Sequence, residues 1–124
     1  MGERVFTPGR RDFERLVLRA LKSVPVAFRR RLRNVAIVVE DDPPERAHSG
    51  EETLLGLFEG VPLTERAFGE GWLPDRITIY RRPIEALCHT RQELEAEIRR
   101  TLLHELGHYF GLDEEQLESL EEGR

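Results

Sequence analysis

The fold of this chain is decided by His104-Glu105-Leu106-Gly107-His108-Tyr109-Phe110-Gly111-Leu112-Asp113, near its C-terminal end. The stretch reads H-E-x-x-H, with a glycine three residues after the second histidine and an aspartate two residues further on. Side chains four positions apart on a helix lie one turn above each other, so His104 and His108 can bind the same metal ion. The segment therefore predicts a helix that supplies two metal ligands.

Glu105 has the position of a general base. It is rotated by about 100° around the helix from His104, so its carboxylate can reach a metal-bound water without becoming a ligand. A catalytic zinc usually takes three protein ligands and keeps one position for water. Gly111 can end the helix in the left-handed conformation and bring Asp113 back towards the histidines. We predict one Zn²⁺ ion bound by His104, His108 and Asp113, although iron, cobalt and nickel also suit such ligands.

This motif resembles that of the zincins. Its glycine and third ligand resemble the metzincin consensus, with Asp113 in place of the third histidine that most members have. The methionine turn of the metzincins has no counterpart, because the only methionine is Met1. The chain is more broadly similar to the minimal zincins, small bacterial proteins described as zinc peptidases of unproven substrate. That similarity includes residues 57–66 and 73–80 and, with the helix motif, covers most of residues 35–120.

The resemblance implies one minimal zincin-like metallopeptidase domain over residues 1–124. Its fold class would be α+β, with a small mixed sheet of three to four strands packed on an N-terminal helix and a long active-site helix. The implied reaction is hydrolysis of a peptide bond, in a peptide or protein substrate bound in extended conformation, by a metal-bound water that Glu105 activates. A rival hypothesis is a non-catalytic zinc-binding interaction module on the same fold. Glu105 favours the enzyme, because a structural zinc needs no base and normally has four protein ligands.

Apolar periodicity predicts the helices. An amphipathic N-terminal helix, with Thr7 and Pro8 at its start, is indicated by Phe13, Leu16, Val17, Ala20 and Leu21. A short helix is expected over residues 27–32, and a short helix or turn over residues 83–87. After Asp113, an acidic helix over residues 114–122 would dock through Leu117 and Leu120.

The active-site helix is predicted over residues 91–110, with Thr90 as its cap and Glu93 in the capping-box position. One core-facing stripe consists of Leu94, Ile98, Leu102 and Leu106. By angular position Glu105 falls within this stripe, so burial should raise the pKa of its carboxyl group. Gly107 costs about 1 kcal/mol relative to alanine inside a helix, which predicts a strand or loop packed closely against it.

Three segments predict strands. The apolar run of residues 35–39 is typical of a strand buried on both faces, and residues 76–80 alternate as a third strand. Residues 54–58 form the second, where Gly56 would allow a bulge or close approach. By the resemblance, this second strand would be the edge that pairs with an extended substrate. Residues 60–75 are expected to form a functional or covering loop, in which Trp72 either lines a substrate pocket or pins the loop to the core.

Composition limits the other functional classes. The chain has 124 residues, of which 35% are charged, and its net charge of -5 argues against a nucleic acid as partner. No apolar run approaches the length of a membrane span, so no membrane is expected as a partner either. The arginines of residues 29–33 are expected to lie on a solvated helix face rather than to bind RNA. The single cysteine, Cys88, is expected to be a small buried residue, and a chain without disulfides suits the cytoplasm. His48 could approach the site from its loop, and Tyr80, Tyr109 and His89 are candidates for stabilising the oxyanion.

Overall fold

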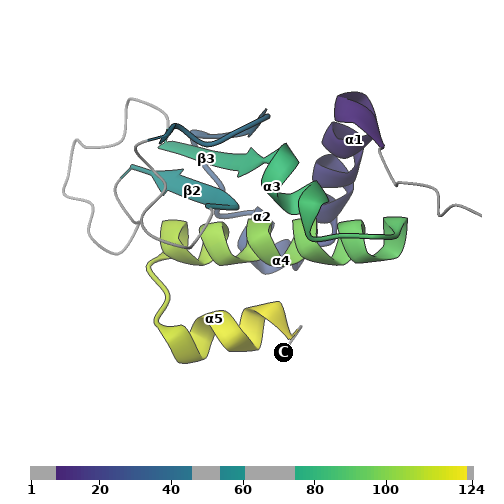
Figure 1. The fold of residues 1–124 in the computed structure, drawn as a ribbon. Coiled ribbons are helices and arrows are strands. Elements are labelled where there is room, and N and C mark those ends of the chain that lie inside the picture. The colour runs from purple at the N-terminus through teal and green to yellow at the C-terminus, as the bar shows by residue number, and fades with distance from the viewer. Residues whose placement is uncertain (1–7, 46–53, 61–74, 123–124) are drawn as a thin grey trace, which may run out of the picture.

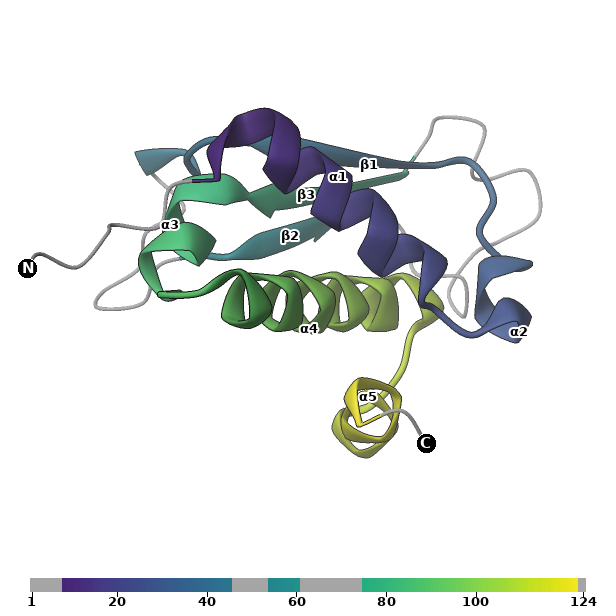
Figure 2. The same ribbon diagram turned by 90° about the vertical axis from the view of Figure 1, so that its right-hand side faces the viewer.

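The computed structural model describes residues 8–45, 54–60 and 75–122, and the predictions for Thr7, His48 and Trp72 lie outside these ranges. In chain order the elements are α1 (Gly9–Lys22), α2 (Val26–Arg29), β1 (Val35–Glu40), β2 (Gly56–Glu59), β3 (Asp75–Tyr80), α3 (Arg81–Ala86), α4 (Arg91–Phe110) and α5 (Glu114–Glu121). In both ribbon views α4 lies between the sheet and α5 (Figures 1 and 2).

The described strands form one mixed sheet in the order β1-β3-β2. β1 pairs with β3 in parallel from Val35 opposite Asp75 to Glu40 opposite Tyr80. β2 pairs with β3 in antiparallel fashion from Gly56 opposite Ile79 to Glu59 opposite Arg76. The α+β class, with a small mixed sheet on an N-terminal helix and a long helix, is confirmed.

The prediction that residues 35–39 are buried on both faces is wrong. Val39 is buried, but Ala36 is exposed and the other residues of β1 are only partly covered. β1 lies at one side of the described sheet, while β3 occupies the centre and buries every residue except Arg76. Apolar, β-branched composition favours a strand, but which strand becomes central depends on its pairing partners.

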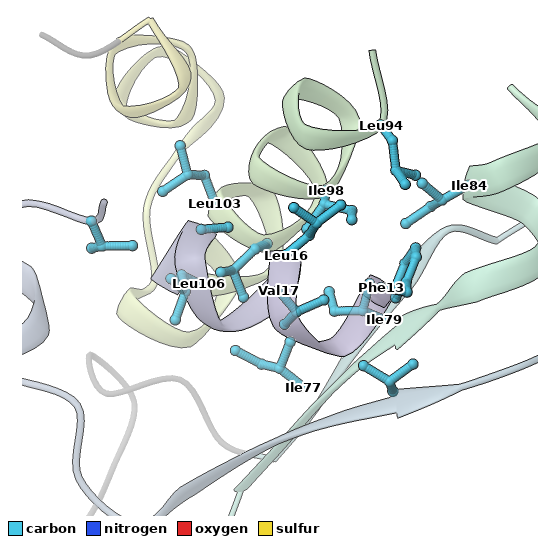
Figure 3. Packing of buried hydrophobic residues seen from close by; sticks show 14 of the residues in the cluster. Phe13, Leu16, Val17, Ile77, Ile79, Ile84, Leu94, Ile98, Leu103 and Leu106 are labelled. Atoms are coloured by element: carbon cyan, nitrogen blue, oxygen red, sulfur yellow. The ribbon is translucent and has the colours of Figure 1, made fainter. Parts of the chain in front are cut away.

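The core lies where α1 and α4 meet the sheet. Figure 3 shows Phe13 and Val17 of α1 pointing into the same cluster as Ile77 and Ile79 of β3. Figure 2 shows α1 crossing the sheet and α4 at an angle. The predicted apolar stripe of α1 is thus confirmed, although Pro8 is the N-cap residue and contributes no side-chain hydrogen bond to the helix start.

The long helix α4 begins and ends where the sequence predicts. The Thr90 hydroxyl accepts a hydrogen bond from the Glu93 backbone N–H at 3.1 Å, while the Glu93 carboxylate accepts one from the His89 N–H at 2.7 Å. This is a variant of the expected capping box, shifted by one residue. The predicted stripe is fully buried throughout: Leu94, Ile98, Leu102 and Leu106 each have 0% exposure.

Gly111 turns the chain between α4 and α5. Its φ of 72° is left-handed, and the following Leu112 N–H donates to the Gly107 carbonyl at 2.9 Å. α5 then lies along α4 on the side away from the sheet (Figure 1). The predicted anchors of α5, Leu117 and Leu120, are both buried.

The absence of a side chain at Gly107 lets α5 pack closely against α4. A Cβ atom built on Gly107 would lie 1.8 Å from Leu117 Cδ2 and 3.0 Å from Leu117 Cγ. The close packing predicted from this glycine is confirmed, but the packed element is a helix rather than a strand or loop. The glycine in the sequence predicts that another element packs closely at this position, but it does not predict which kind of element.

The remaining expectations concern short elements and single residues. The two short helices span Val26–Arg29 and Arg81–Ala86, each shifted towards the N-terminus of its predicted range. Cys88 is buried, as predicted, and burial raises the pKa of its thiol. No helix in the described part of the chain is long and apolar enough to cross a membrane.

We predict that Gly107→Ala destabilises the metal-free protein because its new methyl group overlaps Leu117. Overpacking of this kind costs about 1–3 kcal/mol, against which alanine recovers about 1 kcal/mol of helix propensity. Urea unfolding in the presence of a chelator measures the change in the free energy of unfolding.

The matched control is a double-mutant cycle with Leu117→Ala, which alone should cost about 2–5 kcal/mol. In Gly107→Ala/Leu117→Ala the overlap is gone, so the double variant should be more stable than the sum of the single changes implies. Strictly additive losses would show that the two residues do not meet as described.

Candidate metal centre

The two histidines and the glutamate of the motif come together at the C-terminal half of α4. Potential ligand atoms of His104, Glu105 and His108 all lie within 4.8 Å of one another, and the two imidazole centroids are 4.8 Å apart. Two ligands of one tetrahedral zinc lie about 3.4 Å apart when each bond is about 2.1 Å. Small side-chain rotations would therefore let His104 and His108 bind one metal ion beside the Glu105 carboxylate, and imidazole nitrogens suit zinc.

Glu105 is buried between α4 and the sheet. Glu105 is only 8% exposed, and this burial is the main reason that the pKa of its carboxyl group is raised. The neighbouring His104 and a hydrogen bond from the Phe58 backbone N–H lower that pKa by smaller amounts. The predicted shielding of Glu105 is confirmed, and the Phe58 contact shows that β2 helps to orient its carboxylate.

The two histidines are more accessible than Glu105. The side chain of His104 is 42% exposed, and its Nδ1 lies 3.4 Å from Glu121 Oε1 on α5. Partial burial lowers the pKa of His108, as does the nearby His104, while the Glu114 carboxylate raises it. A lowered pKa favours the neutral imidazole, which is the form that binds metals.

Asp113 has a structural role in this arrangement. It is the N-cap of α5, where its Oδ1 accepts a hydrogen bond from the Gln116 N–H at 2.8 Å and the Gln116 side chain accepts one from the Asp113 N–H at 2.9 Å. This capping box holds the start of α5. The group of mutually close ligand atoms in the described residues does not include Asp113, so its role as third ligand stays a prediction.

Counting along the motif identifies a second carboxylate that could be the third ligand. The metzincin spacing places this ligand three residues after the glycine, and Asp113 follows Gly111 by only two. The residue at that spacing is Glu114, the first residue of α5, whose charge acts on His108. The sequence analysis missed Glu114, although the spacing alone could have identified it.

β2 runs beside the metal group as an edge strand of the described sheet. The Tyr80 N–H donates to the Leu55 carbonyl, and Gly56 lies opposite Ile79. Because antiparallel pairing alternates along a strand, the backbone groups of Gly56 and Phe58 point away from β3. The Phe58 hydrogen bond to Glu105 fits this geometry.

Gly56 allows β2 to lie close to α4. A Cβ atom there would lie 2.8 Å from Thr101 Cγ2 and 3.2 Å from Glu105 Cγ. The close approach predicted from Gly56 is thus confirmed. Beside Gly56 lies a pocket of about 300 Å³. Residues 54–56 line one side of it, and residues of α4 between Glu97 and Glu105, together with Glu121 of α5, line the other.

The three candidates for stabilising an oxyanion have different positions. Tyr109 is fully buried, and its hydroxyl is hydrogen-bonded to the backbone of Arg33 at 3.1–3.2 Å, so it is directed away from the site. His89 precedes α4, about 20 Å along the axis from His104 at 1.5 Å per residue. Tyr80 is buried at the end of β3, where burial and then the Glu59 carboxylate raise its pKa, with a smaller effect of Glu105. Side chains alternate along a strand, so Tyr80 lies on the opposite face of the sheet from Ile79 and Gly56, which face α4. The structure therefore places none of the three candidates at the metal group.

The arginines of residues 29–33 lie on an exposed surface around α2, as expected. Arg29 donates a hydrogen bond to the Val24 carbonyl at 3.0 Å. The backbone of residues 31–33 holds the Tyr109 hydroxyl. This segment therefore has a visible structural function in closing the core.

Residues 32–124 match the family model described as zincin-like metallopeptidase. The chain belongs to this family. No curated protein matches it at a significant level. Membership agrees with the geometry, because the matched region contains every described strand, α4 and α5.

A solved structure supports the same fold for this zincin. It is that of a conserved hypothetical protein from Thermo thermophilus, with 28% sequence identity and a TM-score of 0.57. The match covers 82% of this chain and 92% of the other. The two proteins are therefore similar over most of their lengths.

We predict that zinc stabilises the protein through His104 and His108. Free zinc at 100 times its dissociation constant should raise the free energy of unfolding by about 2.7 kcal/mol. His104→Asn and His108→Asn should each lose this gain, while His89→Asn, which changes an exposed histidine at the other end of α4, should keep it. Urea unfolding with buffered zinc provides the measurement. Equal stabilisation of all three variants would contradict a metal site at the motif.

Proposed function

We propose that this zincin is a zinc-dependent metallopeptidase that binds one ion through His104, His108 and a carboxylate near the start of α5. The observation that supports the proposal most directly is the position of Glu105. It is buried beside both histidines and held by the Phe58 N–H. A purely structural zinc would not need a shielded carboxylate next to its ligands.

The residues of the site have separate roles in the proposed hydrolysis. Zinc, when bound, polarises the substrate carbonyl and lowers the pKa of the attacking water. Glu105 accepts a proton from that water and later donates it to the leaving amine. Its raised pKa helps the second step, while the Phe58 hydrogen bond keeps the carboxylate oriented for the first.

The substrate would bind as an extended chain along β2. Backbone groups of Gly56 and the Phe58 carbonyl point away from β3 and would pair with the substrate backbone. A substrate side chain would enter the pocket of about 300 Å³ between β2 and α4. A cytoplasmic location, expected from the single cysteine, stays a prediction.

The rival hypothesis is a zinc-binding interaction module without catalysis. It shares the fold and the two histidines, and it differs in needing no general base. The burial of Glu105 favours the enzyme, because a carboxylate with no catalytic task would be more stable exposed to water. The two hypotheses give opposite results for the same substitution at Glu105.

We predict that Glu105→Gln keeps zinc and loses peptidase activity. Removal of a general base should lower kcat/KM by about 10²- to 10⁴-fold, while bound zinc remains stoichiometric. The zinc-loaded proteins would be incubated with a diverse peptide pool and the products identified by mass spectrometry. Glu118→Gln, an exposed substitution on α5, is the control of equal charge. Equal cleavage by Glu105→Gln and the unchanged protein, or no cleavage by either, would refute the peptidase hypothesis.

We predict that Glu114→Gln weakens zinc binding at least tenfold, whereas Asp113→Asn has little effect. Asparagine is as good an N-cap as aspartate, so Asp113→Asn removes a charge and keeps the capping box. Competition with a chromogenic chelator would measure both dissociation constants. The reverse order would show that Asp113 is the third ligand, as the sequence analysis predicts.

A further inference from the structure

His104 faces a carboxylate that no part of the sequence motif predicts. Its Nδ1 lies 3.4 Å from Oε1 of Glu121, the last residue of α5, and the Glu121 side chain is 25% exposed. The two residues are 17 positions apart and belong to different helices. Their proximity therefore depends on how α5 packs against α4.

The packing that brings them together is specific. Leu117 of α5 contacts Gly107 of α4, and Glu121 of α5 contacts His104 of α4. Glu121 follows Leu117 by four residues, whereas His104 precedes Gly107 by three. α5 therefore runs antiparallel to α4 (Figure 1). Leu117 and Glu121 lie on the same face of α5, because their spacing is close to one helical turn. The burial of Leu117 thus fixes the position along α4 at which Glu121 contacts His104.

The contact between His104 and the Glu121 carboxylate matters because an imidazole ring has two nitrogens. A histidine that binds a metal through one ring nitrogen commonly donates the N–H of the other to a carboxylate, which fixes the tautomer and the ring orientation. We propose that Glu121 is a positioning residue for the metal site. It accepts the Nδ1–H of His104 and leaves Nε2 of the same ring for the metal.

In this proposal Glu121 acts through His104 and does not itself bind the metal. An ordinary surface ion pair would contribute little to stability and nothing specific to metal affinity. The proposal instead makes zinc affinity depend on the docking of α5.

This inference rests on the metal-binding part of the proposed function and is independent of hydrolysis. Its test compares Glu121→Leu, Glu121→Gln and Glu118→Gln. Glutamine keeps a hydrogen-bond acceptor without the charge, leucine removes both, and Glu118→Gln makes the same charge change one turn away on an exposed position.

We expect Glu121→Leu to weaken zinc binding by about 10- to 100-fold, the range for loss of such a partner. Glu121→Gln should show a smaller loss, and Glu118→Gln should bind zinc like the unchanged protein. Chelator competition measures the dissociation constants, and urea unfolding of the zinc-free proteins shows that each variant is folded. If Glu121→Leu does not fold, the comparison between Glu121→Gln and Glu118→Gln decides the proposal.

A second measurement distinguishes positioning from a general effect on stability. In the zinc-loaded protein, nitrogen-15 NMR should show a protonated Nδ1 and a metal-bound Nε2 on His104, and Glu121→Leu should lose this slowly exchanging N–H. Unchanged zinc affinity in both Glu121 variants would overturn the proposal. An altered cobalt spectrum with loss of stoichiometric binding in Glu121→Gln would also overturn it, because Glu121 would then be a ligand. Failure of the peptidase hypothesis would be seen separately, in Glu105→Gln.

Discussion

Burial of the apolar stripe of α4 is the interaction on which the rest of the structure depends. Leu94, Ile98, Leu102 and Leu106 are each fully buried against α1 and the sheet. Burying such a side chain contributes about 1.5–3 kcal/mol. This packing fixes the rotation of α4 about its axis, and the rotation in turn places Glu105 at the sheet and leaves the two histidines partly open to solvent. The same helix can therefore form the core and present the proposed metal site.

Two glycines let other elements come close to this helix. Gly56 brings β2 to within contact of Thr101 and Glu105, and Gly107 brings α5 into contact through Leu117. A Cβ atom at either position would overlap a neighbouring side chain. The strand supplies the Phe58 N–H to Glu105, and the helix supplies Glu121 to His104. The site is thus held on two sides by elements whose approach requires the absence of a side chain.

The electrostatics of Glu105 follow from this geometry. Burial raises the pKa of its carboxyl group, and the Phe58 hydrogen bond and the proximity of His104 partly oppose that effect. A base that must both accept and return a proton benefits from such a balance. The accessible histidines and the adjacent pocket leave room for an extended peptide along β2. One long helix, one strand and the short helix α5 thus provide the residues of the proposed site.

The sequence by itself determined α4, its Thr90 cap, its buried stripe and the shielding of Glu105, because helical periodicity and capping depend on residues within a few turns of one another. It also determined that Gly56 and Gly107 are points of close approach. Only the tertiary structure decided that β1 lies at the side of the described sheet, that a helix packs on Gly107, and that Glu121 meets His104. These features depend on pairing and packing between segments far apart in the chain, and local periodicity carries no record of them.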